Sequence, residues 1–349
     1  MRGRLRACAA CVAAAACAGP ASARADSAAA STPRASGAVA DDLAPTSEAG
    51  PIAADVFDLR LGLAGVVAHE TRTATCASLA SACGGAPYVE RLGLAVFDAP
   101  IDLAYGLAPW VAVEARVDVR VIDATSSYAA TSGAPIAAPP GVRQADEVQA
   151  GPADMWAMLR FAGARGGLVA SARLGASIPI GKVEPSAGEL AGEGKSTQHV
   201  QFGSGTVRPI VGGALAWSAG AATLAATALV VGSLVDDSRG YRAPTEVYAE
   251  ARGGYALARG ALRPYAAVDV EGANAALWYG APSFEAPGHA ELLVGGGVAW
   301  RFSESWTLDA GARANVASLT PSAGFSYAGT FALGVRATVD VGAAMREPR

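Results

Sequence analysis

Apolar and charged residues alternate between Trp110 and Ile122, strictly so from Val113 to Val121, and this is the clearest pattern in the chain. Successive side chains of a β-strand point to opposite faces, so the odd positions from 111 to 121, all valine or alanine, form one apolar stripe. A soluble sheet buries such a face, whereas a membrane barrel turns it towards lipid and encloses the polar face. The opposite stripe is charged at four successive positions: Glu114, Arg116, Asp118 and Arg120.

The same pattern recurs about a dozen times, which makes the rhythm of the connections informative. We expect strands near 56–67, 92–106, 110–122, 153–163, 167–179, 206–218, 221–233, 245–257, 261–272, 290–302, 305–317 and 326–340. Short connections at 107–109, 163–166, 218–220, 258–260 and 303–304 alternate with long ones at 68–91, 123–152, 180–205, 234–244, 273–289 and 318–325. Tight turns at one rim and long loops at the other are typical of outer-membrane barrels. The sequence therefore predicts an all-β fold, a transmembrane antiparallel up-and-down β-barrel of about 12 strands.

The ends of the chain differ from this pattern. Residues 1–25 have a basic start, an apolar stretch and small residues at Ala21–Ala23 or Ala23–Ala25, which predicts a cleaved secretory signal peptide and export to a Gram-negative outer membrane. Residues 26–54 are rich in Ala, Ser and Pro without periodicity and are expected to be flexible. The barrel is expected over 55–341, followed by a polar tail at 342–349.

Composition narrows the possible partners. Although 52% of the residues are hydrophobic, no run of about 18–20 apolar residues follows the leader, so a membrane-spanning helix is excluded. Removing the leader with its four arginines changes the net charge from −4 to −8, which argues against nucleic acid. The expected partners are outer-membrane lipid, a small-molecule solute and the barrel-assembly machinery, with the oligomeric state left open.

The polar faces of the strands supply the candidate site. Inside a narrow barrel, arginines and carboxylates lie across from one another, where they form bidentate ion pairs and set the field that a solute meets. Neither sign dominates, so we predict weak ion selectivity or a partly occluded lumen. The predicted lumen-lining residues are Arg60, Glu114, Arg116, Asp118, Arg120, Arg173, Glu246, Glu250, Arg252, Arg263, Asp269, Glu271, Asp309, Arg313 and Arg336.

Aromatic residues cluster where strands meet the short turns. Rings prefer the level of the lipid headgroups, so this clustering indicates a girdle at the short-turn rim. Trp278 and Tyr279 are expected near the opposite rim. The residues of the girdle are Tyr105, Trp110, Phe161, Trp217, Tyr255, Trp300, Phe302 and Trp306.

Other chemistry has weaker signals. Cys76 and Cys83 are expected to form a disulfide in an oxidising compartment, and metal binding there is the less favoured alternative. His199 and Ser204 are a conceivable base and nucleophile, but a Gly-rich loop enforces no geometry between them. Residues 295–297, three consecutive glycines, fit bending or close packing better than a phosphate cradle. We therefore expect no enzymatic activity, no cofactor and no metal.

Three short stretches resemble a known family: residues 101–110, 174–181 and 201–206, the last followed by Pro209. They are similar to outer-membrane transporters associated with the meta-pathway of phenol degradation, although Arg208 stands where that family usually has an acidic residue. The resemblance covers roughly 90–220 of the sequence. It implies an outer-membrane channel or transporter for small hydrophobic or aromatic solutes. The alternative is a structural or surface-interaction barrel without transport, and a barrel hydrolase is the third reading.

Overall fold

The computed structural model describes residues 51–75, 86–137, 147–183, 202–282, 288–318 and 325–341. Within these ranges, twelve strands form the wall of a barrel. They are β1 (Val56–Thr75), β2 (Pro87–Ala108), β3 (Val111–Ala130), β6 (Met155–Arg165), β7 (Leu168–Ile178), β8 (Arg208–Ala219), β9 (Ala222–Val231), β11 (Glu246–Tyr255), β12 (Leu262–Ala273), β15 (His289–Arg301), β16 (Trp306–Ser318) and β17 (Phe325–Asp340).

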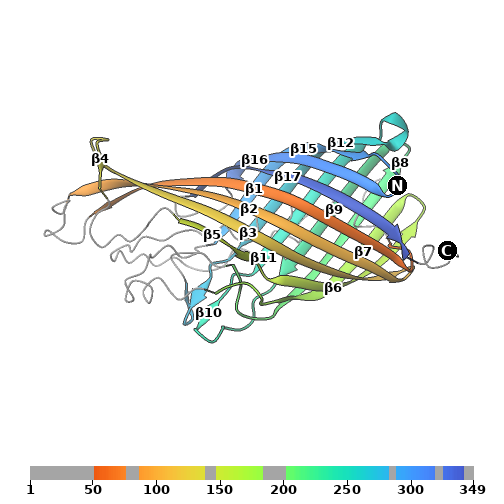
Figure 1. Cartoon of the computed structure of the whole chain (residues 1–349), viewed down its shortest axis with the longest axis horizontal. Coiled ribbons are helices and arrows are strands. Elements are labelled where there is room, and N and C mark those ends of the chain that lie inside the picture. The colour runs from red at the N-terminus through yellow and green to blue at the C-terminus, as the bar shows by residue number, and fades with distance from the viewer. Residues whose placement is uncertain are drawn as a thin grey trace, which may run out of the picture.

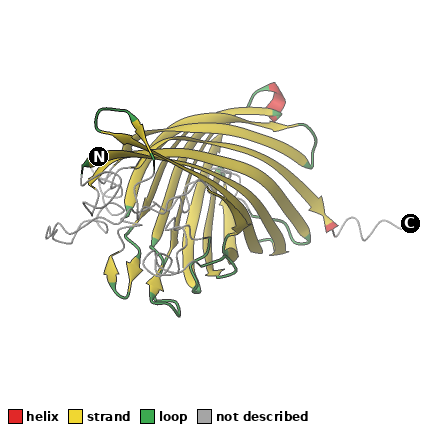
Figure 2. Cartoon of the chain, turned by 60° about the vertical axis from the view of Figure 1, so that its left-hand side comes forward, coloured by secondary structure: helices red, strands yellow, loops and turns green. Residues whose placement is uncertain are grey.

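Each of these strands pairs antiparallel with its neighbours in the chain, and β1 pairs with β17 to close the barrel. The register places Val56 opposite Asp340 at one end of this closing seam. Figures 1 and 2 show the tilted strands wrapping around a common axis. Closure is required in lipid because a free sheet edge would leave backbone groups without hydrogen-bond partners. The predicted fold class, an antiparallel transmembrane β-barrel of twelve strands, is confirmed.

The two rims differ as the connection lengths predict. Short turns and the C-terminal end of β17 lie on the right of Figure 1, and the longer connections lie on the left. A single 3-10 turn, η3 (Ala258–Gly260), interrupts the connection between β11 and β12. No helix in the described part of the chain is long and apolar enough to cross a membrane.

The first three strands are longer than the sequence indicated. β1, β2 and β3 have 20, 22 and 20 residues, and they project beyond the other strands on the left of Figure 1. The predicted loops at 68–91 and 123–152 are therefore partly wrong, because strand pairing continues into both. The second also contains β4 (Pro135–Ile136) and β5 (Glu147–Pro152), which pair with β3. Residues 64–68 are apolar or glycine on both faces, so the alternation disappears although the backbone pairing persists.

A separate sheet lies among the long connections. It consists of β10 (Tyr241–Arg242), β13 (Leu277–Trp278) and β14 (Ala281–Pro282). The rings of Tyr241 and Trp278 pack with their centroids 4.9 Å apart, and Tyr241 is buried. Trp278 therefore packs within the protein instead of standing at a lipid interface as the aromatic pattern predicted.

The outer face of the barrel is apolar. Leu174, Val211 and Leu215 are more than half exposed, as expected for side chains that point away from the lumen into lipid. At the short-turn rim, Trp110 is 61% exposed and stacks on Phe161 with centroids 6.3 Å apart. The remaining exposed rings at this rim are Trp217, Tyr255, Trp300, Phe302 and Trp306.

Several predicted segments lie outside the described residues. These are the leader, most of the flexible segment, the tail at 342–349, and both Cys76 and Cys83. The described chain begins at residue 51 and runs along the short-turn rim, where the Asp55 N–H donates to the carbonyl of Gly106 at 3.0 Å. A Cβ at Gly106 would collide with the Ala53 carbonyl, so only glycine permits this close approach.

Candidate functional site

The structure places the predicted charged residues on the inner face of the barrel. Four of them are held in ion pairs within the wall and line neither of the two cavities described below: Asp118, Arg120, Glu246 and Arg313. The others line two cavities inside the barrel: Arg60, Glu114, Arg116, Arg173, Glu250, Arg252, Arg263, Asp269, Glu271, Asp309 and Arg336.

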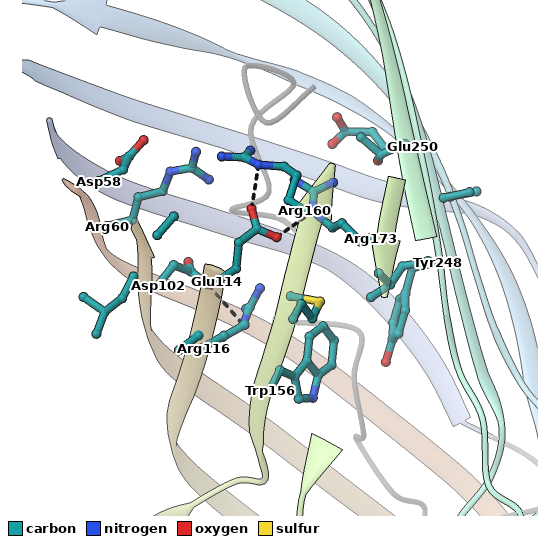
Figure 3. Close-up of a pocket in the computed structure, with 18 of the residues that line it drawn as sticks. Asp58, Arg60, Asp102, Glu114, Arg116, Trp156, Arg160, Arg173, Tyr248 and Glu250 are labelled. Atoms are coloured by element: carbon teal, nitrogen blue, oxygen red, sulfur yellow. Dashed lines mark hydrogen bonds and ion pairs between the residues drawn. The ribbon is translucent and has the colours of Figure 1, made fainter. Parts of the chain in front are cut away.

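Ion pairs across neighbouring strands neutralise much of this charge. Glu114 on β3 lies between two arginines, with Arg160 Nε 3.1 Å from one carboxylate oxygen and Arg173 Nε 2.9 Å from the other (Figure 3). Because β3, β6 and β7 are consecutive in the wall, the Glu114 carboxylate links side chains from three adjacent strands. Charge-assisted hydrogen bonds of this kind offset the cost of removing the groups from water.

A second network joins the opposite side of the barrel. Arg252 contacts both oxygens of Glu250 at 3.0 Å, and Arg313 contacts the same carboxylate at 2.8 Å. Arg313 also pairs with Asp269 on β12. This network extends from β11 to β16, so it fixes the inner wall where the strands carry small residues and glycine.

The cavity in the middle of the barrel, of about 1010 Å³ including open solvent, is lined by charged and apolar side chains together. Trp156 and Tyr248 supply an apolar part of this lining beside charged residues: Trp156 stands opposite Arg116 on the neighbouring strand β3, and Glu250 lies near Tyr248 on β11 (Figure 3). Met158 and Leu229 extend this apolar patch, which packs against the buried residues Ile210 and Val231. We call Trp156, Met158, Leu229 and Tyr248 the apolar patch of the lumen.

Polar contacts hold the two rings of this patch in place. The guanidinium of Arg116 lies 5.6 Å from the centroid of the Trp156 ring, within the range of a cation–π contact. The Tyr248 hydroxyl donates to Glu246 at 2.6 Å. Both rings therefore keep an apolar surface towards the cavity while their polar neighbours fix their orientation.

A second cavity, of about 1430 Å³ including open solvent, lies towards the short-turn rim and shares Arg60 and Asp102 with the first. Here the guanidinium of Arg252 lies 4.0 Å from the centroid of the Tyr265 ring, and the Tyr265 hydroxyl donates to Asp309 at 2.9 Å. A Cβ at Gly297 or at Gly311 would collide with that hydroxyl. The glycine-rich stretch of β15 therefore provides space for a tyrosine ring against the wall, consistent with the expected close packing.

The inner wall becomes apolar towards the long connections. Val66, Val96 and Ile122 are buried on the inner faces of β1, β2 and β3, and Phe202 packs in the same cluster. A Cβ at Gly151 on β5 would lie 3.6 Å from the Phe202 ring, so the ring rests on this glycine. Phe202 stands almost at the end of the predicted loop at 180–205, and its ring lies inside the barrel.

Asp154 anchors the connection between β7 and β8 at both of its ends. Its carboxylate accepts hydrogen bonds from the Gly181 N–H at 3.1 Å, the Ser204 N–H at 2.8 Å and the Ser204 hydroxyl at 2.6 Å. A Cβ at Gly203 would collide with Gly181, so two glycines allow the ends of the connection to meet. The Ser204 hydroxyl thus has a structural partner, and His199 lies outside the described residues. Among the described residues, no group of three His, Cys, Asp or Glu side chains is arranged to hold a metal ion.

Several solved structures of outer-membrane proteins are similar to this barrel. The COG4313 outer membrane channel from Pseudomonas putida F1 superposes with a TM-score of 0.51 at 11% identity, covering 80% of this chain and 95% of that one. OmpT, an outer membrane protein of Vibrio cholerae, gives a TM-score of 0.33 at 11% identity over 81% and 99% of the two chains. The Pseudomonas putida toluene transporter TodX gives 0.36 at 10% identity over 85% and 92%. Only the first score has weight, and at this identity it shows a shared fold.

Sequence comparison adds no family. No protein-family model matches the chain, and no curated protein matches it in sequence. The resemblance to the phenol-degradation transporters therefore stays a prediction.

Several inner residues were not found from the sequence. Asp98 and Asp102 alternate with Phe97 and Ile101, so assigning the two faces of 92–106 would have revealed them. The inner face of β6 was hidden because two of its residues, Trp156 and Met158, are as apolar as the outer face. Asp154 stands between β5 and β6, where no periodicity marks its role.

Proposed function

We propose that this protein is an outer-membrane channel for small hydrophobic or aromatic solutes. The observation that carries the proposal is the apolar patch of Trp156, Met158, Leu229 and Tyr248 inside a lumen that charged residues otherwise line. The fold and the apolar outer face support a place in the outer membrane. The similar protein from Pseudomonas putida F1 is described as an outer membrane channel, which agrees with the proposal.

The apolar and the charged parts of the lining have complementary effects on a solute. An apolar or aromatic body that contacts Trp156 and Leu229 removes surface from water, which contributes about 25 cal/mol for each Å². The charged residues around the patch are held in ion pairs such as Glu114 with Arg160 and Arg173, so these charges are already partnered. Ligand sites commonly combine an apolar lining with a few fixed polar groups in this way.

Towards the long connections the inner wall is apolar but closely packed. Val66, Ile122 and Phe202 are each at most 4% exposed and belong to one buried cluster. We therefore expect this cluster to narrow the lumen and to keep its ionic conductance small.

Planar-bilayer recordings of the full chain purified from membranes test this proposal. We expect a small ionic conductance that benzyl alcohol reduces in a concentration-dependent way, while erythritol, a polar molecule of similar size, has little effect. Trp156→Ala should weaken the reduction by benzyl alcohol several-fold because half of the aromatic surface of the patch is lost. Trp217→Ala is the matched control, since Trp217 is exposed on the outer face of β8.

Two results would overturn the proposal. A protein that inserts in its folded form and never conducts is not a channel. If benzyl alcohol acts equally on wild type, Trp156→Ala and Trp217→Ala, its effect comes from the bilayer and the apolar patch binds no solute.

A further inference from the structure

Charge is segregated along the lumen, although neither sign dominates the barrel as a whole. The central cavity is lined by four arginines and six carboxylates, the latter being Asp58, Asp102, Glu114, Glu250, Asp269 and Glu271. The cavity at the short-turn rim has the opposite balance, with three carboxylates and five arginines: Arg60, Arg252, Arg263, Arg301 and Arg336. An anion that approaches this rim therefore meets an excess of positive charge.

These arginines differ in whether a carboxylate partners them. Arg252 pairs with Glu250, and Arg336 pairs with Asp58. Arg263 and Arg301 line the same cavity as exposed side chains, and among the described residues neither guanidinium has an ion pair or hydrogen bond. The nearby carboxylate of Asp309 already accepts the hydrogen bond of Tyr265, and Glu304 lies in the exposed turn between β15 and β16.

The register brings these two arginines together. Arg263 on β12 stands opposite Ala299 on β15, and Arg301 lies two residues further along β15 on the same inner face. The Arg301 N–H donates to the Ala261 carbonyl at 2.7 Å, which fixes the strand at this point. Residues in this diagonal relation are within reach of each other when their side chains are long, and like charges so placed repel.

A bound carboxylate would relieve that repulsion. Guanidinium groups bind carboxylates through two parallel N–H···O bonds, and two guanidiniums on one wall offer both oxygens a partner. The apolar patch deeper in the lumen favours a solute with an apolar or aromatic body. A solute with both a carboxylate and such a body therefore suits both parts of the lumen.

We infer that the short-turn rim of the lumen is a carboxylate-binding site formed by Arg263 and Arg301, and that the solutes of this barrel are small organic anions with an apolar body. This inference rests on the proposed channel function for its substrate class, but the site itself can be tested without any conductance. Phosphate could occupy the same pair of guanidiniums, so it must be tested beside the carboxylate.

Isothermal titration of the detergent-solubilised full chain tests the site directly. The probes are benzoate, its neutral counterpart benzyl alcohol, and inorganic phosphate. The variants are Arg263→Gln, Arg301→Gln and their double combination, with folding checked by heat-modifiable gel mobility. Arg165→Gln is the matched control, because Arg165 ends β6 at the same rim but is exposed on the outer face.

We expect benzoate to bind wild type and Arg165→Gln equally, and the double variant at least tenfold more weakly. Phosphate should bind more weakly than benzoate, since it lacks an apolar body. The inference is overturned if benzoate does not bind, if the double variant binds it as well as wild type, or if phosphate binds as well as benzoate. Arginine-dependent benzoate binding by a protein that never conducts would remove the channel function and leave the carboxylate site in place.

Discussion

Asp98 and Arg120 stand directly opposite each other on β2 and β3 and form a bidentate ion pair inside the barrel wall. Arg120 Nε lies 2.7 Å from one oxygen of Asp98, and Nη2 lies 2.8 Å from the other. The Asp98 side chain is fully buried. The pair therefore connects two of the three longest strands at the level where the inner wall changes from charged to apolar.

Removing Asp98 should destabilise the barrel strongly. In Asp98→Ala the guanidinium of Arg120 stays buried without its partner, which costs about 3–5 kcal/mol. Urea unfolding in lipid vesicles, followed by gel mobility, measures this loss. The double variant Asp98→Leu with Arg120→Met replaces the pair by apolar side chains and should recover most of the stability. Equal unfolding of Asp98→Ala and wild type would contradict the role of this ion pair.

Gly311 should tolerate alanine only when the hydroxyl of Tyr265 is absent. A Cβ at Gly311 would lie 2.6 Å from that oxygen, so Gly311→Ala should cost about 1–3 kcal/mol from overpacking. Adding Tyr265→Phe removes the hydroxyl and should restore part of the stability, even though the hydrogen bond to Asp309 is lost. The measurement is the urea midpoint of each single variant and of the double variant.

Gly297 provides the control for this rescue. Its Cβ would collide with the backbone carbonyl of Ala310 as well as with the Tyr265 hydroxyl. Tyr265→Phe should therefore fail to rescue Gly297→Ala. If it rescues both alanine variants equally, the Ala310 carbonyl is no obstacle at Gly297, and if it rescues neither, space for the tyrosine ring is not what these glycines provide.

Release of the anchor at Asp154 should free the connection that carries Phe202. Asp154→Ala removes the acceptor of three hydrogen bonds, from the Gly181 N–H and from the N–H and hydroxyl of Ser204. We expect faster proteolysis of the connection between β7 and β8 on intact cells, and larger fluctuations of the ionic current. Ser204→Ala, which loses only the hydroxyl contact, should give a smaller effect of the same kind. Unchanged proteolysis in Asp154→Ala would show that the carboxylate does not hold this segment.

The sequence predicts most of the barrel wall because the two faces of a strand differ wherever one is charged. In β3, the alternation of Glu114, Arg116 and Asp118 with valine and alanine is sufficient to assign both faces. The same argument fails in β6, where Trp156 and Met158 make the inner face apolar. It also fails at residues 64–68, so β1 appeared to end eight residues before Thr75. The apolar patch of the lumen, on which the proposed function rests, is therefore the part of the candidate site that the alternation of apolar and charged residues does not reveal.

The sequence could not predict which carboxylate pairs with which arginine, and the reason is different. Glu114 and Arg173 are 59 positions apart, and Asp58 and Arg336 are 278 apart. An up-and-down topology predicts which strands are neighbours, but the stagger between them decides which carboxylate meets which guanidinium. That stagger depends on bulges such as the one between Val67 and Ala68, which leave no periodic signal.

The direction in which the side chains point can be tested with one substitution on each face. Leu174 on β7 is 57% exposed on the outer face, so Leu174→Arg should cost about 2–4 kcal/mol if it lies near the bilayer midplane. Thr227 on β9 lines the central cavity directly opposite Glu250, so Thr227→Arg gains a carboxylate neighbour and should be tolerated. Urea unfolding in lipid vesicles compares the two. If Thr227→Arg is the more damaging, the apolar face does not meet lipid and the charged face does not line the lumen, which would remove the basis of the channel.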